Sequence, residues 1–211
     1  MIAPWKKYRL GFWGNVFCLF TASICFGAQC LSLSPTLRGA KNAYAPITVR
    51  ELTPGEQEGL GRLFRSLAGT WQGRADSFFC RSAEDPADVE NDQEIMHAKV
   101  SVDYYGNWYM SADFYSAGKK AGRQEMLTLY QNNRKLRIDH DTGVGDVELI
   151  EVSDTTIAFL YRRFLSIGRS GSSRREHFFT LKAAGGSFTI EQLLYIQGKL
   201  SSGQTWRFER G

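Results

Sequence analysis

The sequence predicts an all-β protein: an antiparallel up-and-down β-barrel of about 8–10 strands, preceded by one short α-helix and by an N-terminal signal or hydrophobic helix. Three observations support this fold class. Apolar residues recur at amphipathic helical spacing just before Gly69, they alternate with polar residues after it, and turn residues separate the alternating segments. Closure into a barrel removes the exposed edges of such a sheet, and a two-sheet sandwich is the alternative.

The N-terminus has the pattern of an export signal. Lys6, Lys7 and Arg9 precede an apolar run over residues 10–28, and such a run enters the membrane while its basic flank stays behind. We therefore expect an exported protein, either periplasmic or secreted. Because the run has nearly the ~20 residues that span a bilayer, a retained membrane anchor over residues 10–28 is the alternative.

The point of signal cleavage has several candidates. Small residues precede a cut after Gly27 or Ala28, and equally a cut after Ala45. Residues 27–30 also resemble in part a lipoprotein cleavage box, which would place a lipid on Cys30. These alternatives stay open at the level of the sequence.

The basic residues are concentrated at the N-terminus. The chain has 26 Lys and Arg against 22 Asp and Glu, a formal charge of +4. Residues 1–45 hold five of the basic residues and no acid, which leaves residues 46–211 with 21 basic and 22 acidic residues. This near-neutral domain excludes nucleic acid as a partner of the whole domain, and we expect membrane contact only through the N-terminal segment. The oligomeric state does not follow from the charge.

The chain divides into residues 1–45 (signal or anchor plus linker), 46–67 (linker and capping helix) and 68–211 (barrel). The helix begins with Thr53 as N-cap, Pro54 at the first helical position and Glu56 three residues after the cap, which is a capping box. The apolar stripe of this helix is Leu60, Leu63, Phe64 and Leu67.

Period-2 alternation predicts ten strands after the helix. In the second of them Met96, Ala98 and Val100 share one face, which continues through Val102 to Tyr104. The expected strands are residues 70–80, 94–105, 108–116, 124–131, 135–140, 145–152, 155–164, 174–183, 187–196 and 203–209.

The cysteines predict no disulfide framework. Cys18, Cys25 and Cys30 lie in or beside the signal, and Cys80 stands between Phe79 and Arg81 in an expected strand. We therefore expect Cys80 to be a packed core residue rather than a nucleophile or a disulfide partner.

The segment that opens the first strand, residues 67–73 (Leu-Ala-Gly-Thr-Trp-Gln-Gly), resembles the start of lipocalin-like proteins of the calycin superfamily. In that superfamily a Gly-x-Trp motif begins strand one, and an Arg of the last strand lies over the Trp ring. The resemblance implies that Trp71, following Gly69, closes the base of the barrel, with Arg207 or Arg210 over its ring. A fold resemblance of this kind does not deliver a function.

The same motif also resembles nitrobindin-like, ten-stranded haem barrels, in which a His ligates iron. His97, His140 and His177 lie in different strands, and none of them is assigned to that ligand position. His140 and His177 can both point inward, but a single strand residue with an ordinary hydrogen bond is the simpler interpretation. Residues 139–146 are read as a hairpin rather than a calcium loop. We expect no catalytic residue, no metal and no cofactor.

Two charged segments stand out among the expected connections. Residues 82–94 hold six acids and no base, and residues 162–175 hold five arginines and no acid. A solvated loop is one interpretation of each. The other is that the arginines guard an opening and attract a carboxylate or phosphate group: Arg162, Arg163, Arg169, Arg174 and Arg175.

We therefore expect an exported, non-catalytic, lipocalin-like barrel that binds a small apolar or amphipathic molecule, such as a lipid or fatty-acid-like compound. Tyr104, Trp108, Tyr161 and Arg163 are the expected ligand-binding residues. The first alternative is a structural or interaction protein of the cell envelope with a filled barrel, docking through the two charged segments. The second is a haem-binding or isomerase-type barrel.

Overall fold

The computed structural model describes Cys30 and residues 32–36, 47–82, 85, 88–116, 122–167 and 171–211. The apolar run 10–28, the cleavage candidates around residues 27–28 and 43–45, and Arg169 lie outside the described residues, so the export signal stays a prediction. Within the described residues, no helix combines the length and the apolar character needed to cross a bilayer.

Helix α2 (Pro54–Leu67) begins at the predicted capping box. The Thr53 hydroxyl accepts the Glu56 backbone N–H at 3.3 Å, and the Glu56 carboxylate accepts the Thr53 backbone N–H at 2.8 Å. Arg50 binds the same carboxylate and, together with the Thr53 bonds, lowers the pKa of Glu56 to about 2. The predicted apolar stripe is buried and faces the barrel: Leu60, Leu63, Phe64 and Leu67.

A single antiparallel sheet of eleven strands follows, in the order β6-β5-β4-β3-β2-β1-β11-β10-β9-β8-β7. The strands are β1 (Gly69–Cys80), β2 (Val89–Val102), β3 (Trp108–Ser116), β4 (Arg123–Asn132), β5 (Lys135–His140), β6 (Gly143–Asp146), β7 (Glu148–Val152), β8 (Thr156–Ile167), β9 (Gly171–Ala184), β10 (Ser187–Ile196) and β11 (Lys199–Arg210).

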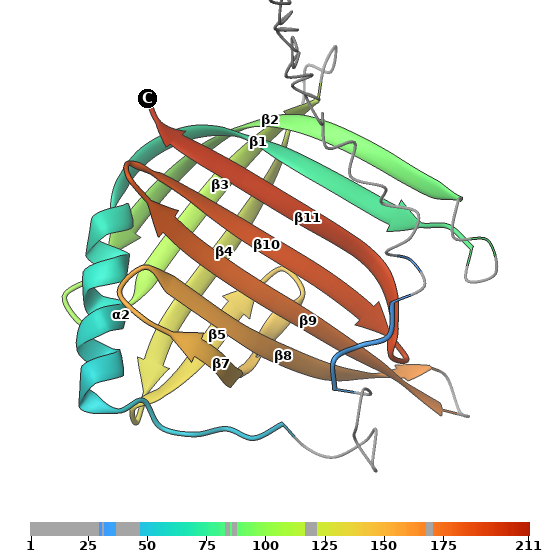
Figure 1. Ribbon diagram of the computed structural model, residues 1–211, viewed down its shortest axis with the longest axis horizontal. Coiled ribbons are helices and arrows are strands. Elements are labelled where there is room, and N and C mark those ends of the chain that lie inside the picture. Colours follow the sequence, from blue (N-terminus) through green and yellow to red (C-terminus); the bar gives the residue numbers. More distant parts are fainter. Residues whose placement is uncertain are drawn as a thin grey trace, which may run out of the picture.

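The sheet curls into a nearly closed barrel (Figure 1). Its two edges, β6 and β7, follow each other in the chain, and the Tyr161 hydroxyl of β8 donates to Val144 O of β6 across the gap. The predicted all-β antiparallel barrel is confirmed at this level. The strand number is higher than predicted because the expected strand 145–152 is interrupted at Val147.

Helix α2 lies across one end of the barrel, next to the start of β1 (Figure 1). There the indole N–H of Trp71 donates to Leu67 O at 2.8 Å, and the Trp71 ring meets the Phe188 ring edge-on at 4.8 Å. The guanidinium of Arg210 lies 5.3 Å from the centre of the Trp71 ring. Arg207 is on the outer face instead, paired with Asp76. This half of the barrel is filled with apolar side chains.

At the opposite end, which we call the open end, strands β1, β3, β8 and β10 finish and β2, β4, β9 and β11 begin (Figure 1). The barrel wall is incomplete there, because β5, β6 and β7 are short. β4 pairs with β5 only from Leu127 to Asn132, and β8 pairs with β7 only from Ile157 to Leu160. The ends of β4 and β8, residues 123–126 and 161–167, are therefore not continued by another ladder on that side. We call this break in the hydrogen-bonded wall, beside the open end, the notch; the Tyr161 and Arg163 side chains lie in it, against β6.

A short N-terminal segment, Cys30 with residues 32–36, lies against the outside of the barrel at the open end; we call it the strap. It pairs with the end of β11 through a bridge from Leu33 to Lys199 and a 2.8 Å bond from Ser34 N–H to Gly198 O. It also adjoins a second, smaller apolar cluster around Phe78 and Tyr195 on the outer face. Ser34 is completely buried in this arrangement.

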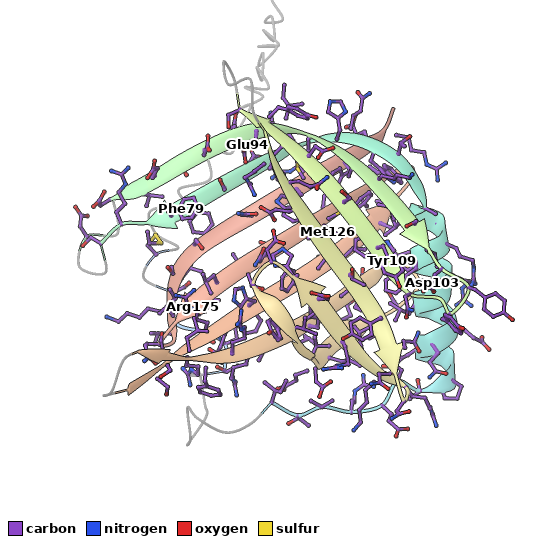
Figure 2. The ribbon with its side chains drawn as sticks, turned by 180° about the vertical axis from the view of Figure 1, so that it is seen from behind. Phe79, Glu94, Asp103, Tyr109, Met126 and Arg175 are labelled. Atoms are coloured by element: carbon purple, nitrogen blue, oxygen red, sulfur yellow. A yellow bond between two sulfur atoms is a disulfide. The ribbon has the colours of Figure 1, made fainter. Side chains whose placement is uncertain are left out.

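The strap is joined to the barrel by a disulfide between Cys30 and Cys80, so the expectation that Cys80 is an unpaired core residue is wrong. Its partner, Cys30, belongs to a segment that the sequence pattern places beside the predicted export signal. The bond also uses the thiol that lipidation of Cys30 would need. The yellow bond beside Phe79 in Figure 2 marks this link.

We predict that Cys80→Ser destabilises the protein. The two cysteines are 50 residues apart, and a loop of that length is associated with ~4 kcal/mol of chain entropy, against about 2–4 kcal/mol typically measured. Urea unfolding should show the loss, Cys30→Ser should match it, and the double variant should cost no more than either. A Cys30 peptide that runs free of the Cys80 peptide in a non-reducing digest would contradict the pairing.

Candidate functional site

Polar side chains gather inside the open half of the barrel, where they line a cavity of about 160 Å³. Carboxylate, imidazole, amide and hydroxyl groups from five strands converge on it, whereas the half next to α2 presents aromatic rings. Strand alternation places Glu125, His140, His177, Gln192 and Gln204 there, because each lies at an inward position of its strand, and Thr142 follows from the turn after β5. The lining residues are Glu125, His140, Thr142, His177, Gln192, Leu194, Ser202, Gly203 and Gln204.

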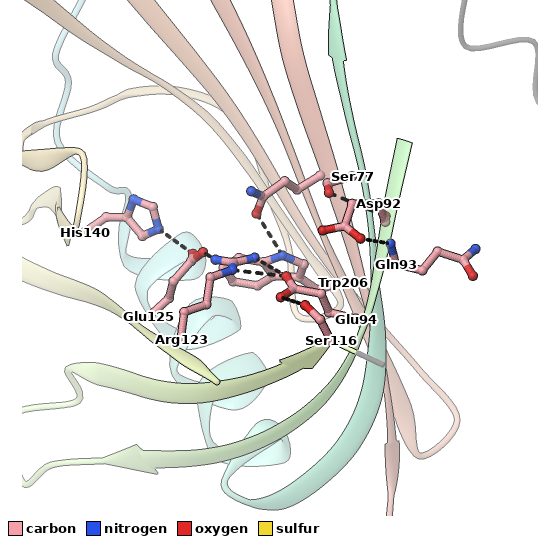
Figure 3. Close-up of polar contacts among 10 residues, drawn as sticks. Ser77, Asp92, Gln93, Glu94, Ser116, Arg123, Glu125, His140 and Trp206 are labelled. Carbon is pink, nitrogen blue, oxygen red and sulfur yellow. Dashed lines mark hydrogen bonds and ion pairs between the residues drawn. The ribbon is translucent and has the colours of Figure 1, made fainter. Parts of the chain in front are cut away.

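One wall of the cavity is a row of alternating charges. Arg123 binds the Glu94 carboxylate through Nη2 at 2.7 Å and also contacts the Glu125 carboxylate, so that it stands between two acids (Figure 3). Its guanidinium lies 3.8 Å from the centre of the Phe114 ring. Both carboxylates are buried, and the shared arginine is what allows two acids to remain inside the barrel.

His140 presents a ring N–H to the cavity. The Thr142 backbone N–H donates to His140 Nδ1 at 3.3 Å, which assigns the proton of the neutral ring to Nε2. That Nε2 is buried and has no hydrogen-bond partner within the described part of the chain; the nearest acid, Glu125, is 3.5 Å away as an ion-pair contact. Burial lowers the pKa of His140, so the ring is neutral near pH 7.

His177, on β9, is arranged in the same way. The Gln192 side-chain amide lies 3.1 Å from His177 Nδ1, and with the amide as donor the ring carries its proton on Nε2. Burial lowers the pKa of His177 to about 4, with further lowering by His140, Arg175 and Arg163. The prediction that His140 and His177 both point inward is therefore confirmed, and each also has the ordinary hydrogen bond expected of a strand residue.

The arginine segment is not the loop that the sequence suggested. β8 continues to Ile167 and β9 starts at Gly171, so four of its five arginines lie in strands. Alternation then divides them. Arg163 and Arg175 share the inward face with Tyr161 and His177, whereas Arg162 and Arg174 face outward.

The outward pair surrounds Glu176, which is completely buried. Arg162 donates to Glu176 Oε1 at 3.0 Å, Arg174 Nε lies 3.8 Å from Oε2, and the Thr36 hydroxyl of the strap donates to Oε1 at 2.8 Å. The acidic segment is likewise not a loop throughout, because residues 89–94 belong to β2. Its last acid, Glu94, is buried inside the barrel, where Arg123 binds it. The acids Asp85, Asp88, Glu90 and Asp92 of this segment are exposed, so docking through it, the interaction alternative, stays a prediction.

The structure separates the four expected ligand-binding residues. Tyr104 lies in the turn after β2 and is 97% exposed, so the inward orientation expected for it is wrong; β2 ends at Val102. Trp108 is fully buried against Phe64, near α2 and away from the polar cavity. Tyr161 and Arg163 do lie beside the cavity, in the notch. Burial raises the pKa of Tyr161, whose hydroxyl donates to Val144 O at 3.2 Å.

Sequence reasoning missed Glu125, Gln192 and Gln204, because it weighted aromatic residues and local motifs. A signal was present. Glu125 stands two residues before Leu127, and Gln204 two before Trp206, so each is a polar residue in register with an apolar inward face. Polar residues at core positions of a strand are the pattern that identifies this cavity.

The described residues contain no group of three or more His, Cys, Asp or Glu side chains placed to hold a metal ion. The polar groups that do converge are hydrogen-bond donors and acceptors with fixed orientation. Their arrangement suits recognition of a small molecule, because each imidazole ring is held through its Nδ1 and the Gln204 amide and the Glu125 carboxylate each have a contact within the wall.

No protein-family model matches the chain, and no curated protein matches it either. Among solved structures, the chain is similar to a protein of unknown function of the DUF3598 family from Nostoc punctiforme, with 16% sequence identity and a TM-score of 0.44. The match covers 80% of this chain and 53% of the other, so the chain spans about half the length of that protein. A likeness this distant does not extend to the side chains of the cavity.

We predict that His177 titrates near pH 4 in the folded protein. Its ring stays neutral in the barrel but takes up a proton near pH 6.5 once unfolded, so stability falls as the pH drops from about 6.5 to about 4. NMR titration of the His177 ring should show the low value, and Arg175→Gln should raise it by removing a nearby positive charge. Arg74→Gln, on the exposed outer face, should leave it unchanged. A His177 ring that titrates near 6.5 would contradict this arrangement.

Proposed function

We propose that the protein is an exported, lipocalin-like barrel that binds a small polar or amphipathic molecule in the cavity of its open half, without catalysing a reaction. The observation that carries the proposal is the buried Nε2–H of His140, which faces a polar cavity and has no hydrogen-bond partner in the described part of the chain. A buried donor left in this way costs about 1–3 kcal/mol, which a ligand acceptor would recover.

The hydrogen-bonding groups that line the cavity indicate what kind of ligand it can bind. His140 and His177 supply N–H donors, Glu125 supplies an acceptor, and Gln204 supplies an amide whose oxygen accepts the Trp206 indole N–H at 3.0 Å. A ligand with at least one acceptor oxygen satisfies the imidazoles. An additional hydroxyl or N–H group would satisfy the carboxylate.

The size of the cavity argues for a compact ligand. At about 160 Å³ it is smaller than the ~300–1,000 Å³ of pockets that hold drug-sized molecules. The apolar half offers no continuation, because Trp108, Phe114, Phe159, Phe179 and Phe208 fill it and are at most 2% exposed. Only a short apolar part fits inside, so neither a long acyl chain nor a haem is favoured.

Export is supported by the disulfide between Cys30 and Cys80. Structural disulfides form and persist in oxidising compartments such as the periplasm or the extracellular space. This agrees with the basic and apolar pattern of residues 6–28.

Native mass spectrometry of the full chain, recovered from an envelope or secreted fraction, tests the proposal. We expect a small-molecule adduct at one per chain, together with a shift of the His140 ring N–H signal in NMR spectra when the extracted molecule is added back to stripped protein. An unchanged mass, with no response of His140 to extracts of that fraction, would overturn the proposal.

A pair of neighbouring positions on β10 gives a matched control. Gln192→Trp places a large ring in the cavity and should abolish the adduct, whereas Glu191→Trp projects outward on the same strand and should retain it. Thermal unfolding checks that both variants are folded. Equal retention of the adduct by both folded variants would place the ligand elsewhere on the protein.

A further inference from the structure

Two arginines face each other on the inner wall beside the cavity. Arg163 of β8 and Arg175 of β9 are directly opposite in the antiparallel register, next to the inward pair Tyr161 and His177. The Arg163 guanidinium reaches over β6 at Gly143, where a Cβ atom would come within 2.6 Å of Arg163 Nη1. The lack of a side chain at Gly143 therefore leaves the space that this guanidinium occupies.

Neither arginine has an acidic partner. In the described part of the chain no Asp or Glu oxygen lies within 4.0 Å of either guanidinium, and Arg175 Nε is buried without a hydrogen-bond partner. Like charges directly opposite each other in a sheet are destabilising, and partly buried arginines usually pair with acids. Arg162 and Arg174, one position away in each strand, illustrate the usual solution because Glu176 lies between them.

The other groups around the pair add donors. His177 presents Nε2–H from the same wall, and His140 does so from β5. Of the nearby acids, Glu125 contacts Arg123, whereas Asp139 and Asp141 are exposed and neither forms an ion pair with Arg163 or Arg175 within the described residues. The described groups around the two arginines thus supply positive charge and N–H donors.

We propose that Arg163 and Arg175 form an anion-binding subsite, and that the molecule bound in the open half carries a compact oxyanion, a carboxylate or a phosphate group. The inference rests on the proposed function and names the chemical class of its ligand. A planar guanidinium donates two parallel N–H bonds to such a group, and an anion between the two arginines replaces their repulsion by two attractions. The subsite opens through the notch, so the rest of the ligand can extend towards His140 and His177.

Calorimetric titration with sodium propionate, sodium phosphate and neutral propionamide tests the subsite. We expect saturable binding of propionate or phosphate, weakened at least tenfold in Arg163→Gln and in Arg175→Gln, and weakened by added sodium chloride. Arg74→Gln, which alters an exposed arginine of β1, is the matched control and should bind as the unaltered protein does.

Co-sedimentation with phosphatidic acid vesicles distinguishes the two sources of such an anion. Co-sedimentation that is lost in Arg163→Gln would identify a lipid headgroup rather than a soluble anion as the source.

The thermal stability of the same variants gives a second test that does not depend on anion binding. Without added anion, Arg163→Gln and Arg175→Gln should unfold at a temperature equal to or higher than the unaltered protein, because each removes one of two facing like charges. Anion binding that both folded variants retain at full strength would overturn the subsite. Propionamide binding without propionate or phosphate binding would overturn it too, while leaving the proposed function intact. If the His140 ring N–H signal responded to no extract, the proposed function itself would be wrong.

Discussion

The alternation of side chains along each strand determines which charged residues point into the barrel and which point outward, and the rest of the structure depends on it. In β8 and β9, successive arginines point to opposite faces. The outward pair, Arg162 and Arg174, is compensated by Glu176 and covered by the strap. The inward pair, Arg163 and Arg175, lies beside the cavity and has no acidic partner among the described residues. One run of basic residues therefore yields a structural cluster outside the barrel and an inward-facing arginine pair inside it.

The two ends of the barrel differ for an equally simple reason. Helix α2 covers one end with an apolar stripe, so the strand positions beneath it are aromatic and well packed. At the other end β5, β6 and β7 are too short to complete the wall, so the ends of β4 and β8 have no hydrogen-bonded neighbour on that side. Polar side chains are tolerated there because Arg123 neutralises the two acids and because each imidazole is held by one hydrogen bond.

The sequence was sufficient to predict the helix with its capping box, the barrel class and most of the strands, because these depend on local periodicity and turn chemistry. It did not reveal the partner of Cys80, since a disulfide joins segments that only the closed fold brings together. It also misplaced Tyr104, because the alternation of β2 was continued two residues beyond its end at Val102. Arg163 and Tyr161 were identified from charge and aromatic character, but the cavity beside them depends on long-range pairing. Glu125 and Gln204 could have been found by asking which inward strand positions are polar.

The central claim is that the open half of the barrel recognises an anionic group between Arg163 and Arg175. Anomalous diffraction from crystals grown with selenate tests it most directly, because selenium reports the position of the oxyanion itself. We expect a selenium peak inside the notch, within hydrogen-bond reach of both guanidinium groups. Selenate found only at exposed outer arginines, with the space between Arg163 and Arg175 empty of it, would contradict the claim.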